Sequence, residues 1–474
     1  MNNFRLPKYP GIFEINTRAW LESMQSKYPD IKLNDVHPDI WSEIKNQGFD
    51  LVWLMGVWQN NVHLVDKYAY DEGLLDAYGK ALPDWTKQDV VGSPYAIDQY
   101  KLNPLIGKKG ALRSVKTEMN NLGLGLILDF VPNHFHAESQ IIEQVPNAFL
   151  KGSKDLLEKD PVTYYESVHN AELILAHGKD PYFAAWQDTV QVNIFHEAGR
   201  KLLINTLLEL TKVCDGVRCD MAMLLMNDVF SETWKQPLAI HEATSPGNEF
   251  WFEAISAVKA VRPDFIFIAE AYWDLEWDLQ QLGFDFTYDK RLRDRLLFNP
   301  VHEVRDHLRA TGEFQDKSVR FLENHDEDRA FSAFGEQKSM AAAMVTYTVP
   351  GMRFVHDGQF EGVKNKVPVQ LGRFPRTFAN QRLIRFYTKL FKLINSEIFR
   401  NGDWGLIEVY PKDDDSFSNI LAWEWRNGND HAIVIINYSP FPASCFVSKG
   451  KLNRSFVLEA YHSVIYNNEV NIEF

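Results

Sequence analysis

The stretch Gly216-Val217-Arg218-Cys219-Asp220-Met221-Ala222 decides how the rest of the chain is interpreted. It follows an amphipathic run that predicts a helix, with leucines at 202, 203, 207 and 210. We interpret residues 216–222 as a short buried strand whose end presents Arg218 and Asp220 on one side, because strand side chains alternate with a period of two. Such a pair is either a structural salt bridge or a carboxylate that a guanidinium holds ionised for nucleophilic attack. Carboxylates at the ends of neighbouring strands would favour the second interpretation.

The composition bounds the class of protein and the kind of partner. The chain has 474 residues, 45% of them hydrophobic and 24% charged, which is typical of a globular protein with a large core. Its net charge of −14 argues against nucleic acid or an anionic membrane as a partner. The aromatic content of 13% suits stacking on neutral ring-shaped ligands, so a carbohydrate partner fits the composition better than a polyanion.

The cysteines and the N-terminal stretch indicate the compartment. Cys214, Cys219 and Cys445 have no metal-ligand spacing, and the first two are predicted to be buried small apolar residues. The N-terminal stretch MNNFRLPKYPGIFEIN lacks the apolar core of a signal peptide, and no run approaches the length of a transmembrane span. We therefore expect a soluble, cytoplasmic protein.

One pattern recurs along most of the chain: a helix ends in Gly or Pro, an apolar strand follows, and polar residues gather at the end of the strand. The strands are apolar on both faces, as a parallel sheet requires. Eight such units predict an α/β fold, a (β/α)₈ TIM barrel. The eight predicted strands are 12–16, 50–55, 124–130, 216–222, 265–270, 284–288, 319–322 and 350–355.

Two regions depart from the pattern and define the predicted domains. Residues 135–190 follow the third strand, lack the repeat and are too long for an ordinary loop, so they predict a small inserted domain. From residue 401 to 474 apolar and polar residues alternate in short stretches separated by turn residues, with strands expected at 405–409, 419–425, 431–437 and 455–458. This pattern predicts a C-terminal antiparallel β-sandwich domain. The barrel itself takes residues 1–134 and 191–400.

Polar residues gather at the C-terminal ends of the predicted strands, where barrel active sites form. Each of them alone has a structural explanation, such as a cap or a salt bridge. Several carboxylates and two histidines around one barrel mouth are costly for stability and indicate function. The residues are Asp129, Asn133, His134, Arg218, Asp220, Glu270, His325 and Asp326.

Two chemistries use carboxylates on successive barrel strands. A metal site for enolate chemistry also needs Lys or His on facing strands, which the second and sixth strand ends lack, and Arg218 would repel the metal. Retaining glycoside hydrolysis needs an ionised nucleophile and a proton-holding acid/base. Asp220 beside Arg218 suits the first role, and Glu270 after the apolar run 265–269 suits the second.

Four segments in this order resemble the α-amylase superfamily of glycoside hydrolases and transglycosylases, across the whole chain. They are Asp129-Phe-Val-Pro-Asn133-His134, Gly216-Val-Arg218-Cys-Asp220, Glu270 in Ile-Ala-Glu-Ala, and Asn324-His325-Asp326. The resemblance implies Asp220 as nucleophile, Glu270 as acid/base and Asp326 as a third carboxylate that binds and distorts the sugar. It places His134, Arg218 and His325 against the same sugar or the nucleophile, Tyr95 as a stacking ring, and Asp129 in the substrate-binding set. Gln191-Val192-Asn193 loosely matches a further segment of the family.

Departures from the family pattern limit what the resemblance implies. Many starch-cleaving members carry a Lys-His pair shortly after the nucleophile, where this chain has Met223-Leu224. This difference argues against endo-acting hydrolysis of long starch chains and against the family's calcium site near Asn133. The eighth-strand segment 357–361 also differs slightly from the common pattern. Trp58, Trp234, Trp273 and Trp277 either line acceptor subsites or pack in the core, and the sequence leaves both alternatives open.

The sequence therefore predicts a retaining glycosidase that acts on α-glucosidic bonds of oligo- or polysaccharides, with no cofactor needed for the chemistry. The alternative is a transglycosylase of the same superfamily. A non-catalytic carbohydrate-binding relative is disfavoured because the predicted nucleophile, acid/base and third carboxylate are all present. The linkage, the acceptor, endo or exo action and the oligomeric state stay open.

Overall fold

The computed structural model describes residues 5–449, 452–467 and 470–474. Eight apolar strands close into a parallel barrel, and the chain returns outside the sheet between successive strands. Residues 1–4 of the N-terminal stretch lie outside the described part. The strand order around the barrel is β1-β14-β13-β12-β11-β10-β5-β2, which confirms the predicted TIM barrel. The strands are β1 (Gly11–Asn16), β2 (Leu51–Met55), β5 (Gly125–Phe130), β10 (Gly216–Cys219), β11 (Ile266–Ala269), β12 (Phe286–Tyr288), β13 (Ser318–Arg320) and β14 (Met352–His356).

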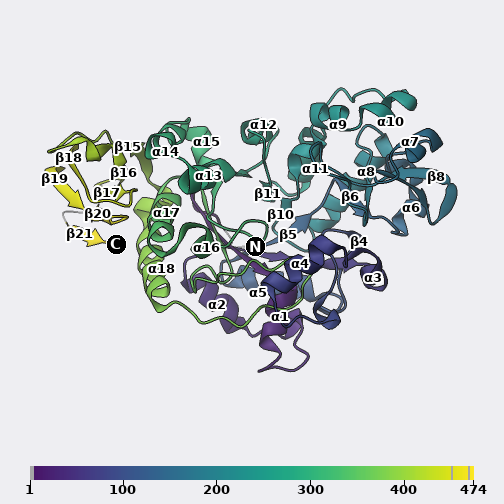
Figure 1. Ribbon diagram of the computed structural model, residues 1–474, viewed down its shortest axis with the longest axis horizontal. Helices are drawn as coiled ribbons and strands as arrows, with labels where there is room; N and C mark the ends of the chain where they lie inside the picture. The colour runs from purple at the N-terminus through teal and green to yellow at the C-terminus, as the bar shows by residue number, and fades with distance from the viewer. Residues whose placement is uncertain (1–4, 450–451, 468–469) are drawn as a thin grey trace.

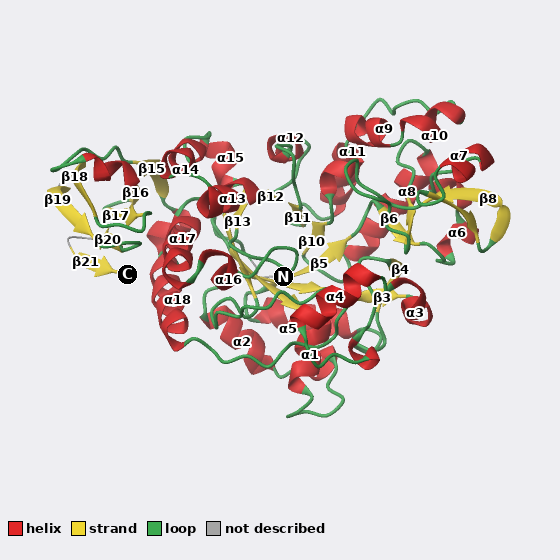
Figure 2. Cartoon of the chain, viewed as in Figure 1, coloured by secondary structure: helices red, strands yellow, loops and turns green. Residues whose placement is uncertain are grey.

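Helices surround the barrel (Figure 2). α2 shows how the sequence sets their limits: Pro38 occupies its first turn, and the chain leaves the helix through Gly48 at φ +100°. No helix among the described residues is long and apolar enough to cross a membrane. Outside the insertion the helices are α1 (Thr17–Met24), α2 (Pro38–Asn46), α3 (Val65–Tyr68), α4 (Glu72–Ala81), α5 (Ala111–Asn121), α8 (Glu197–Leu210), α9 (Asn227–Thr233), α10 (Lys235–Ile240), α11 (Phe250–Val261), α12 (Glu276–Gln281), α13 (Lys290–Phe298), α14 (Val301–His307), α15 (Gly312–Asp316), α16 (Ala330–Phe334), α17 (Glu336–Thr348), α18 (Gln381–Ile394) and α19 (Glu397–Asn401).

The core has two layers because each barrel strand is buried on both faces. Side chains that point inward fill the barrel, among them Leu51, Ile127, Met352 and Phe354. Side chains that point outward pack against the helices in a larger cluster. The predicted strands are apolar on both faces for this reason.

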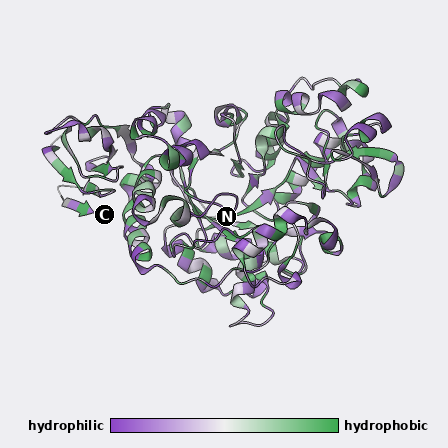
Figure 3. Ribbon diagram, viewed as in Figure 1, coloured by the Kyte–Doolittle hydropathy of each residue, from purple (hydrophilic) through white to green (hydrophobic). Residues whose placement is uncertain are grey.

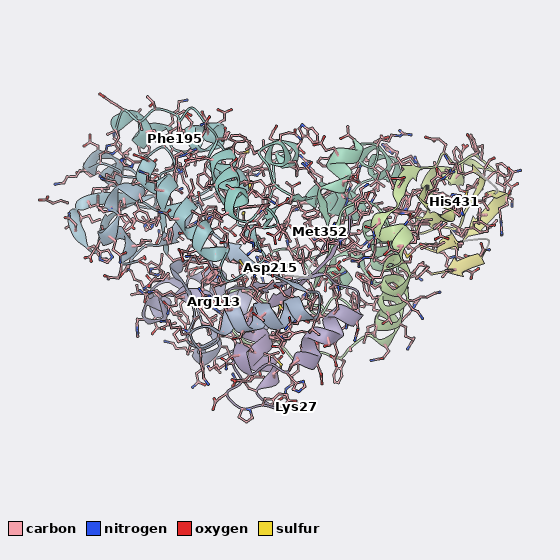
Figure 4. All side chains as sticks on the ribbon, turned by 180° about the vertical axis from the view of Figure 1, so that it is seen from behind. Lys27, Arg113, Phe195, Asp215, Met352 and His431 are labelled. Atoms are coloured by element: carbon pink, nitrogen blue, oxygen red, sulfur yellow. The ribbon has the colours of Figure 1, made fainter. Side chains whose placement is uncertain are left out.

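The strand β10 is held at its start and ends earlier than the sequence predicts. Asp215, in the middle of the molecule (Figure 4), accepts hydrogen bonds from Leu126 N at 3.1 Å and Asn120 Nδ2 at 2.8 Å, which ties β10 to β5. The prediction of a strand over 216–222 is wrong for its last residues. Met221 has a φ of +41°, and Ala222–Leu225 form a 3₁₀ turn, so Asp220 lies at the point where the chain leaves the barrel.

The segment between β5 and α8 forms small antiparallel ladders at one side of the barrel (Figure 1). β6 (His134–His136) pairs with β9 (Thr189–Gln191), and β7 (Tyr164–Ser167) pairs with β8 (Asn170–Ala176). The second half of β8 is buried and apolar, and appears green in Figure 3. The short helices α6 (Ile141–Gln144) and α7 (Lys154–Lys159) complete the insertion.

The C-terminal strands, yellow in Figure 1, lie at the opposite end of the molecule. A two-stranded sheet packs with a five-stranded antiparallel sheet around a core of its own. The larger sheet contains β15 (Asp403–Leu406), β16 (Ile420–Asn427), β17 (Asp430–Asn437), β20 (Ser463–Asn467) and β21 (Val470–Glu473), and the smaller one β18 (Ala443–Lys449) and β19 (Leu452–Leu458). Hydrogen bonds from Trp425 Nε1 to Thr348 O (2.7 Å) and from Tyr438 Oη to Leu296 O (2.6 Å) attach this part to the barrel helices.

The packing at the start of β10 predicts a sharp difference between two glycine substitutions. A Cβ at Gly216 would lie 2.5 Å from Ile266 O and 2.8 Å from Ile127 Cδ1, so Gly216→Ala must push neighbouring barrel strands apart. We expect it to lower the free energy of unfolding by about 1–3 kcal/mol. Gly312→Ala is the matched control, because nothing lies within 4 Å of its Cβ. Urea unfolding of both variants tests this, and equal midpoints would contradict it.

Candidate active site

The predicted site residues come from separate elements that end at one mouth of the barrel. Asp129 and Arg218 lie on β5 and β10, Asp220 and Glu270 directly follow β10 and β11, and the pair His325–Asp326 follows β13. His134 begins β6, and Tyr95 precedes β4 (Ile97–Leu102). In a parallel barrel the C-terminal strand ends open on the same side, so these side chains converge.

Arg218 is the centre of the cluster. Its Nη1 lies 2.5 Å from Asp220 Oδ1, and its Nη2 lies 2.9 Å from Glu270 Oε2. Asp129 Oδ1 and Asp326 Oδ2 each lie 3.9 Å from the guanidinium. Only 1% of the Arg218 side chain is exposed, so this charge is buried among four carboxyl groups. Without it, the carboxylates would repel one another in a medium of low dielectric constant.

Aromatic rings fix the position of this guanidinium. The Arg218 Cζ atom lies 5.1 Å from the ring centroid of Trp53, 5.5 Å from that of Tyr95 and 5.8 Å from that of Tyr288. These are cation–π distances, and ring faces hold a cation without competing for its N–H groups. The guanidinium therefore keeps its Nη donors for the carboxylates. The sequence analysis did not identify Trp53 or Tyr288 as part of the site.

Glu270 is placed to hold a proton near neutral pH. Tyr272 Oη donates to its Oε1 at 2.8 Å, and Met221 N donates to its Oε2 at 2.6 Å. The left-handed backbone of Met221 aims that N–H group at the carboxyl. Burial raises the pKa of Glu270 to about 7, although Arg218 favours the ionised form. A general acid needs such a raised pKa, because a solvent-exposed Glu has lost its proton at neutral pH and has none to donate.

A second positive charge, on His325, lies next to the Arg218 cluster and contacts it through Asp326. His325 Nε2 lies 2.9 Å from Asp326 Oδ2 and 2.8 Å from Tyr95 Oη, and its Nδ1 lies 2.6 Å from Glu14 Oε1. Although desolvation opposes protonation, Asp326 and Glu14 raise the pKa of His325 to about 10. Partial desolvation likewise opposes ionisation of Asp326, but the His325 imidazolium and Arg218 hold the pKa of Asp326 well below its usual range.

Glu14 is a site residue that the sequence analysis missed. It lies on β1 and is fully buried, with Oε1 bonded to His325. A single carboxylate inside the otherwise apolar run 12–15 was the signal that could have identified it.

Asp129 and Trp58 support the site from within the protein. Asp129 Oδ2 accepts a hydrogen bond from Gly56 N at 2.9 Å, and burial raises the pKa of Asp129 to about 6. Trp58 Nε1 donates to Asp129 O at 2.7 Å. Trp58 and Trp234 are each 2% exposed and pack in the core, whereas Trp273 is partly buried and Trp277 is 39% exposed.

The surroundings of Asn133 do not fit a calcium ion. Gln191 Nε2 donates to Asn133 O and to Asn133 Oδ1, both at 2.9 Å, so an N–H donor faces the oxygens that a calcium ion would need. Met223 and Leu224 are buried and apolar and supply no side-chain oxygen. The adjacent His134 is buried, which lowers its pKa to about 4 and keeps it neutral.

The site lies at the C-terminal mouth of a (β/α)₈ barrel. It combines a carboxylate paired with a guanidinium and a buried carboxyl that holds a proton. This is the arrangement expected of barrel proteins that act on glycosidic bonds. Residues 42–432 match the family model of the alpha amylase catalytic domain. The chain belongs to the alpha-amylase family of glycoside hydrolases.

Individual relatives are distant in sequence and similar in fold. The chain is 23% identical over 304 residues to alpha-amylase MalA of Haloarcula japonica, covering 62% of this chain and 42% of that protein. It is 22% identical over 315 residues to alpha-amylase 3 of Dictyoglomus thermophilum, covering 61% of this chain and 58% of that protein. The chain thus spans about half the length of the curated relatives that it matches.

Two solved structures are similar along nearly the whole chain. A noncanonic maltogenic alpha-amylase, AmyB of Thermotoga neapolitana, has a TM-score of 0.67 and 20% identity, covering 100% of this chain and 99% of that one. The alpha-amylase GTA of Geobacillus thermoleovorans, complexed with acarbose, has a TM-score of 0.66 and 18% identity, covering 98% and 99%. At these identities the similarity establishes the fold alone.

The raised pKa of Glu270 predicts the alkaline side of the pH profile. The carboxyl is protonated below its folded pKa and loses its proton as the pH rises through about 7. Cleavage that needs this proton should therefore be present at acidic pH and fall above about pH 7, as kcat/KM of the free enzyme reports. A profile that stays flat to pH 9 would contradict this assignment.

The contact between Glu14 and His325 predicts a second pH effect. Glu14→Gln keeps the shape of the side chain but removes the buried negative charge that favours the imidazolium. The pKa of His325 should fall, so that the positive charge beside Asp326 is lost at lower pH than in the wild type. We expect kcat to fall by about tenfold relative to the wild type at pH 8 and by less at pH 5, since the interaction that shifts a pKa by one unit corresponds to a factor of about ten. An unchanged pH profile in a folded variant would show that Glu14 does not act on the site.

Proposed function

We propose that the protein cleaves α-glucosidic bonds of oligo- or polysaccharides with retention of configuration, through a covalent glycosyl-enzyme intermediate. The observation that carries the proposal is the shared guanidinium, since Arg218 contacts both Asp220 and Glu270. Two carboxyl groups on one guanidinium are close neighbours. A retaining mechanism requires them to stand roughly 5–5.5 Å apart, whereas an inverting one needs room for a water between them.

In the first step Asp220 attacks the anomeric carbon while Glu270 donates its proton to the glycosidic oxygen, and the leaving sugar departs as an alcohol. In the second step the Glu270 carboxylate takes a proton from water, whose oxygen attacks the anomeric carbon and releases Asp220. Arg218 pairs with the nucleophile Asp220, and burial raises the pKa of the acid Glu270 to about 7. Both carboxyl groups contact Arg218, but Glu270 is the more deeply buried, with 3% of its side chain exposed against 11% for Asp220, which fits the role of the proton donor.

The remaining residues suit the sugar at the cleavage site. Asp326, half-exposed and held ionised beside His325, offers a negative charge to the oxocarbenium-like transition state. Tyr95 stacks on the His325 ring with centroids 5.4 Å apart, which gives this wall of the mouth a flat aromatic face. His134, neutral at physiological pH, can donate or accept one hydrogen bond with a sugar hydroxyl.

Family membership and the names of the relatives support an α-glucan substrate. The matched proteins from Haloarcula and Dictyoglomus are named alpha-amylases, and the similar Thermotoga structure is named a maltogenic alpha-amylase. The test is turnover of an aryl α-glucoside and of maltooligosaccharides, with NMR detection of the first-formed anomer, in the presence and absence of a chelator. We expect the α-anomer first and no effect of the chelator. A β-anomer first, or no turnover of any α-glucoside, would refute the proposal; products longer than the substrate would favour the transglycosylase.

Leaving-group dependence separates the roles of the two carboxyl groups. Glu270→Gln removes the proton donor, so maltooligosaccharides should lose about 10²–10⁴-fold in rate, whereas glucosyl fluoride, which needs little protonation, should lose far less. Asp220→Asn should abolish turnover of both, because no covalent intermediate forms without the nucleophile. If the two variants share one leaving-group dependence, the assigned roles are wrong.

A further inference from the structure

The loop between β8 and β9, residues 177–188, is an ordered part of the insertion. At its base His177 Nδ1 lies 2.7 Å from Thr189 O, and Trp186 N donates to Gly178 O at 2.8 Å. At its tip Asp180 Oδ1 accepts hydrogen bonds from Tyr182 N at 2.7 Å and Phe183 N at 2.9 Å. The turn therefore presents two exposed aromatic side chains from a fixed backbone.

This loop contacts the barrel mouth at two places on either side of the nucleophile. The ring of Trp186 lies 5.3 Å from that of His134, which follows β5. The ring of Tyr182 lies 5.0 Å from that of Trp273, edge to face, and Trp273 follows β11. β10, which Asp220 directly follows, lies between β5 and β11 in the barrel, so the two contacts of the loop flank the strand of the nucleophile.

The barrel side of the second contact is held in an unusual backbone conformation. Trp273 and Asp274 both have a φ of +64°, a region that residues with side chains rarely occupy. Asp274 pairs with Arg291 on α13, which holds the turn in place. Strained backbone of this kind gathers at functional sites, where the surrounding structure maintains it. Here it directs the Trp273 ring towards the insertion.

The position relative to Glu270 identifies which part of a substrate would meet this contact. The acid must lie against the glycosidic oxygen, so residues that directly follow Glu270 line the leaving-group side of the bond. Asp326 lies 3.9 Å from the same Arg218 Nη2 that contacts Glu270, and the ring of His325, which Tyr95 contacts, lies beside Asp326, away from Trp273 in the chain order of the barrel strands. The contact between Tyr182 and Trp273 thus crosses the leaving-group side.

We propose that the Tyr182–Trp273 contact closes the leaving-group side of the cleft and selects short α-gluco-oligosaccharides over long polymers. This inference rests on the function proposed above. A polymer cut in its interior needs an open path on both sides of the cleavage site, and a bridge between insertion and barrel interrupts that path. A leaving group of one or two sugars ends before the bridge and can stack on the exposed face of Tyr182, which is 68% exposed.

The test compares kcat/KM on maltotetraose with kcat/KM on long-chain amylose for the wild type and for Tyr182→Ala, Trp273→Ala and the double variant. The wild type should prefer maltotetraose, and each single variant should lower the preference by about tenfold, the scale of one aromatic contact. Because both changes remove the same contact, the preference for maltotetraose should be little lower in the double variant than in either single variant. Trp273→Phe keeps a ring on the strained turn and should retain part of the preference.

Phe183→Ala is the matched control, because Phe183 is equally exposed on the same turn and makes no ring contact within the described part of the chain. Its preference should equal that of the wild type. A wild type that prefers amylose, or folded Tyr182 and Trp273 variants with an unchanged ratio, would overturn the inference while leaving the proposed function intact. Loss of all α-glucoside turnover in the wild type would instead refute the proposed function.

Discussion

The buried guanidinium of Arg218 is the interaction on which the site depends. Four carboxyl groups from four strand ends lie within 3.9 Å of it, and none of them could approach the others so closely without a positive charge between them. The guanidinium is held in turn by the rings of Trp53, Tyr95 and Tyr288, so its position is set by packing as well as by charge. A lysine ammonium is a compact point charge and could not present separate N–H donors to several carboxyl groups as the planar guanidinium does.

Unequal burial then separates the carboxyl groups chemically. Glu270 is nearly inaccessible and retains a proton to about pH 7, while Asp326 is half-exposed, contacts an imidazolium and stays ionised. Glu14 lies on β1, inside the barrel, and contacts the other nitrogen of the His325 ring. A positive group therefore lies between the two carboxyl groups of Asp326 and Glu14. The mouth therefore contains two cations among carboxylates, an arrangement in which neighbouring groups take different protonation states at the same pH.

The barrel and the insertion contribute different parts of the site. All the groups that would take part in bond cleavage come from barrel strand ends, which the hydrogen-bonded sheet holds at fixed distances. The insertion supplies side chains at the rim, through the loop 177–188 and its contacts with His134 and Trp273. A rim built from a loop can vary more readily than the strand ends, because the barrel sheet and not the loop holds the carboxylates.

The sequence by itself determined the eight-stranded barrel, since apolar strands alternating with capped helices leave a parallel sheet as the way to bury both strand faces. It also determined which polar residues gather at the strand ends, because Asp220 and Glu270 directly follow their strands and Asp326 lies in the polar segment 323–326 after an apolar run. Only the tertiary structure decided how these residues pair. Glu14 and Asp326 are 312 positions apart along the chain, yet one imidazole joins them because β1 and β13 both flank β14 in the closed barrel. The ring contact between Tyr182 and Trp273 and the end of β10 at Cys219 likewise depend on tertiary neighbours that the local sequence does not specify.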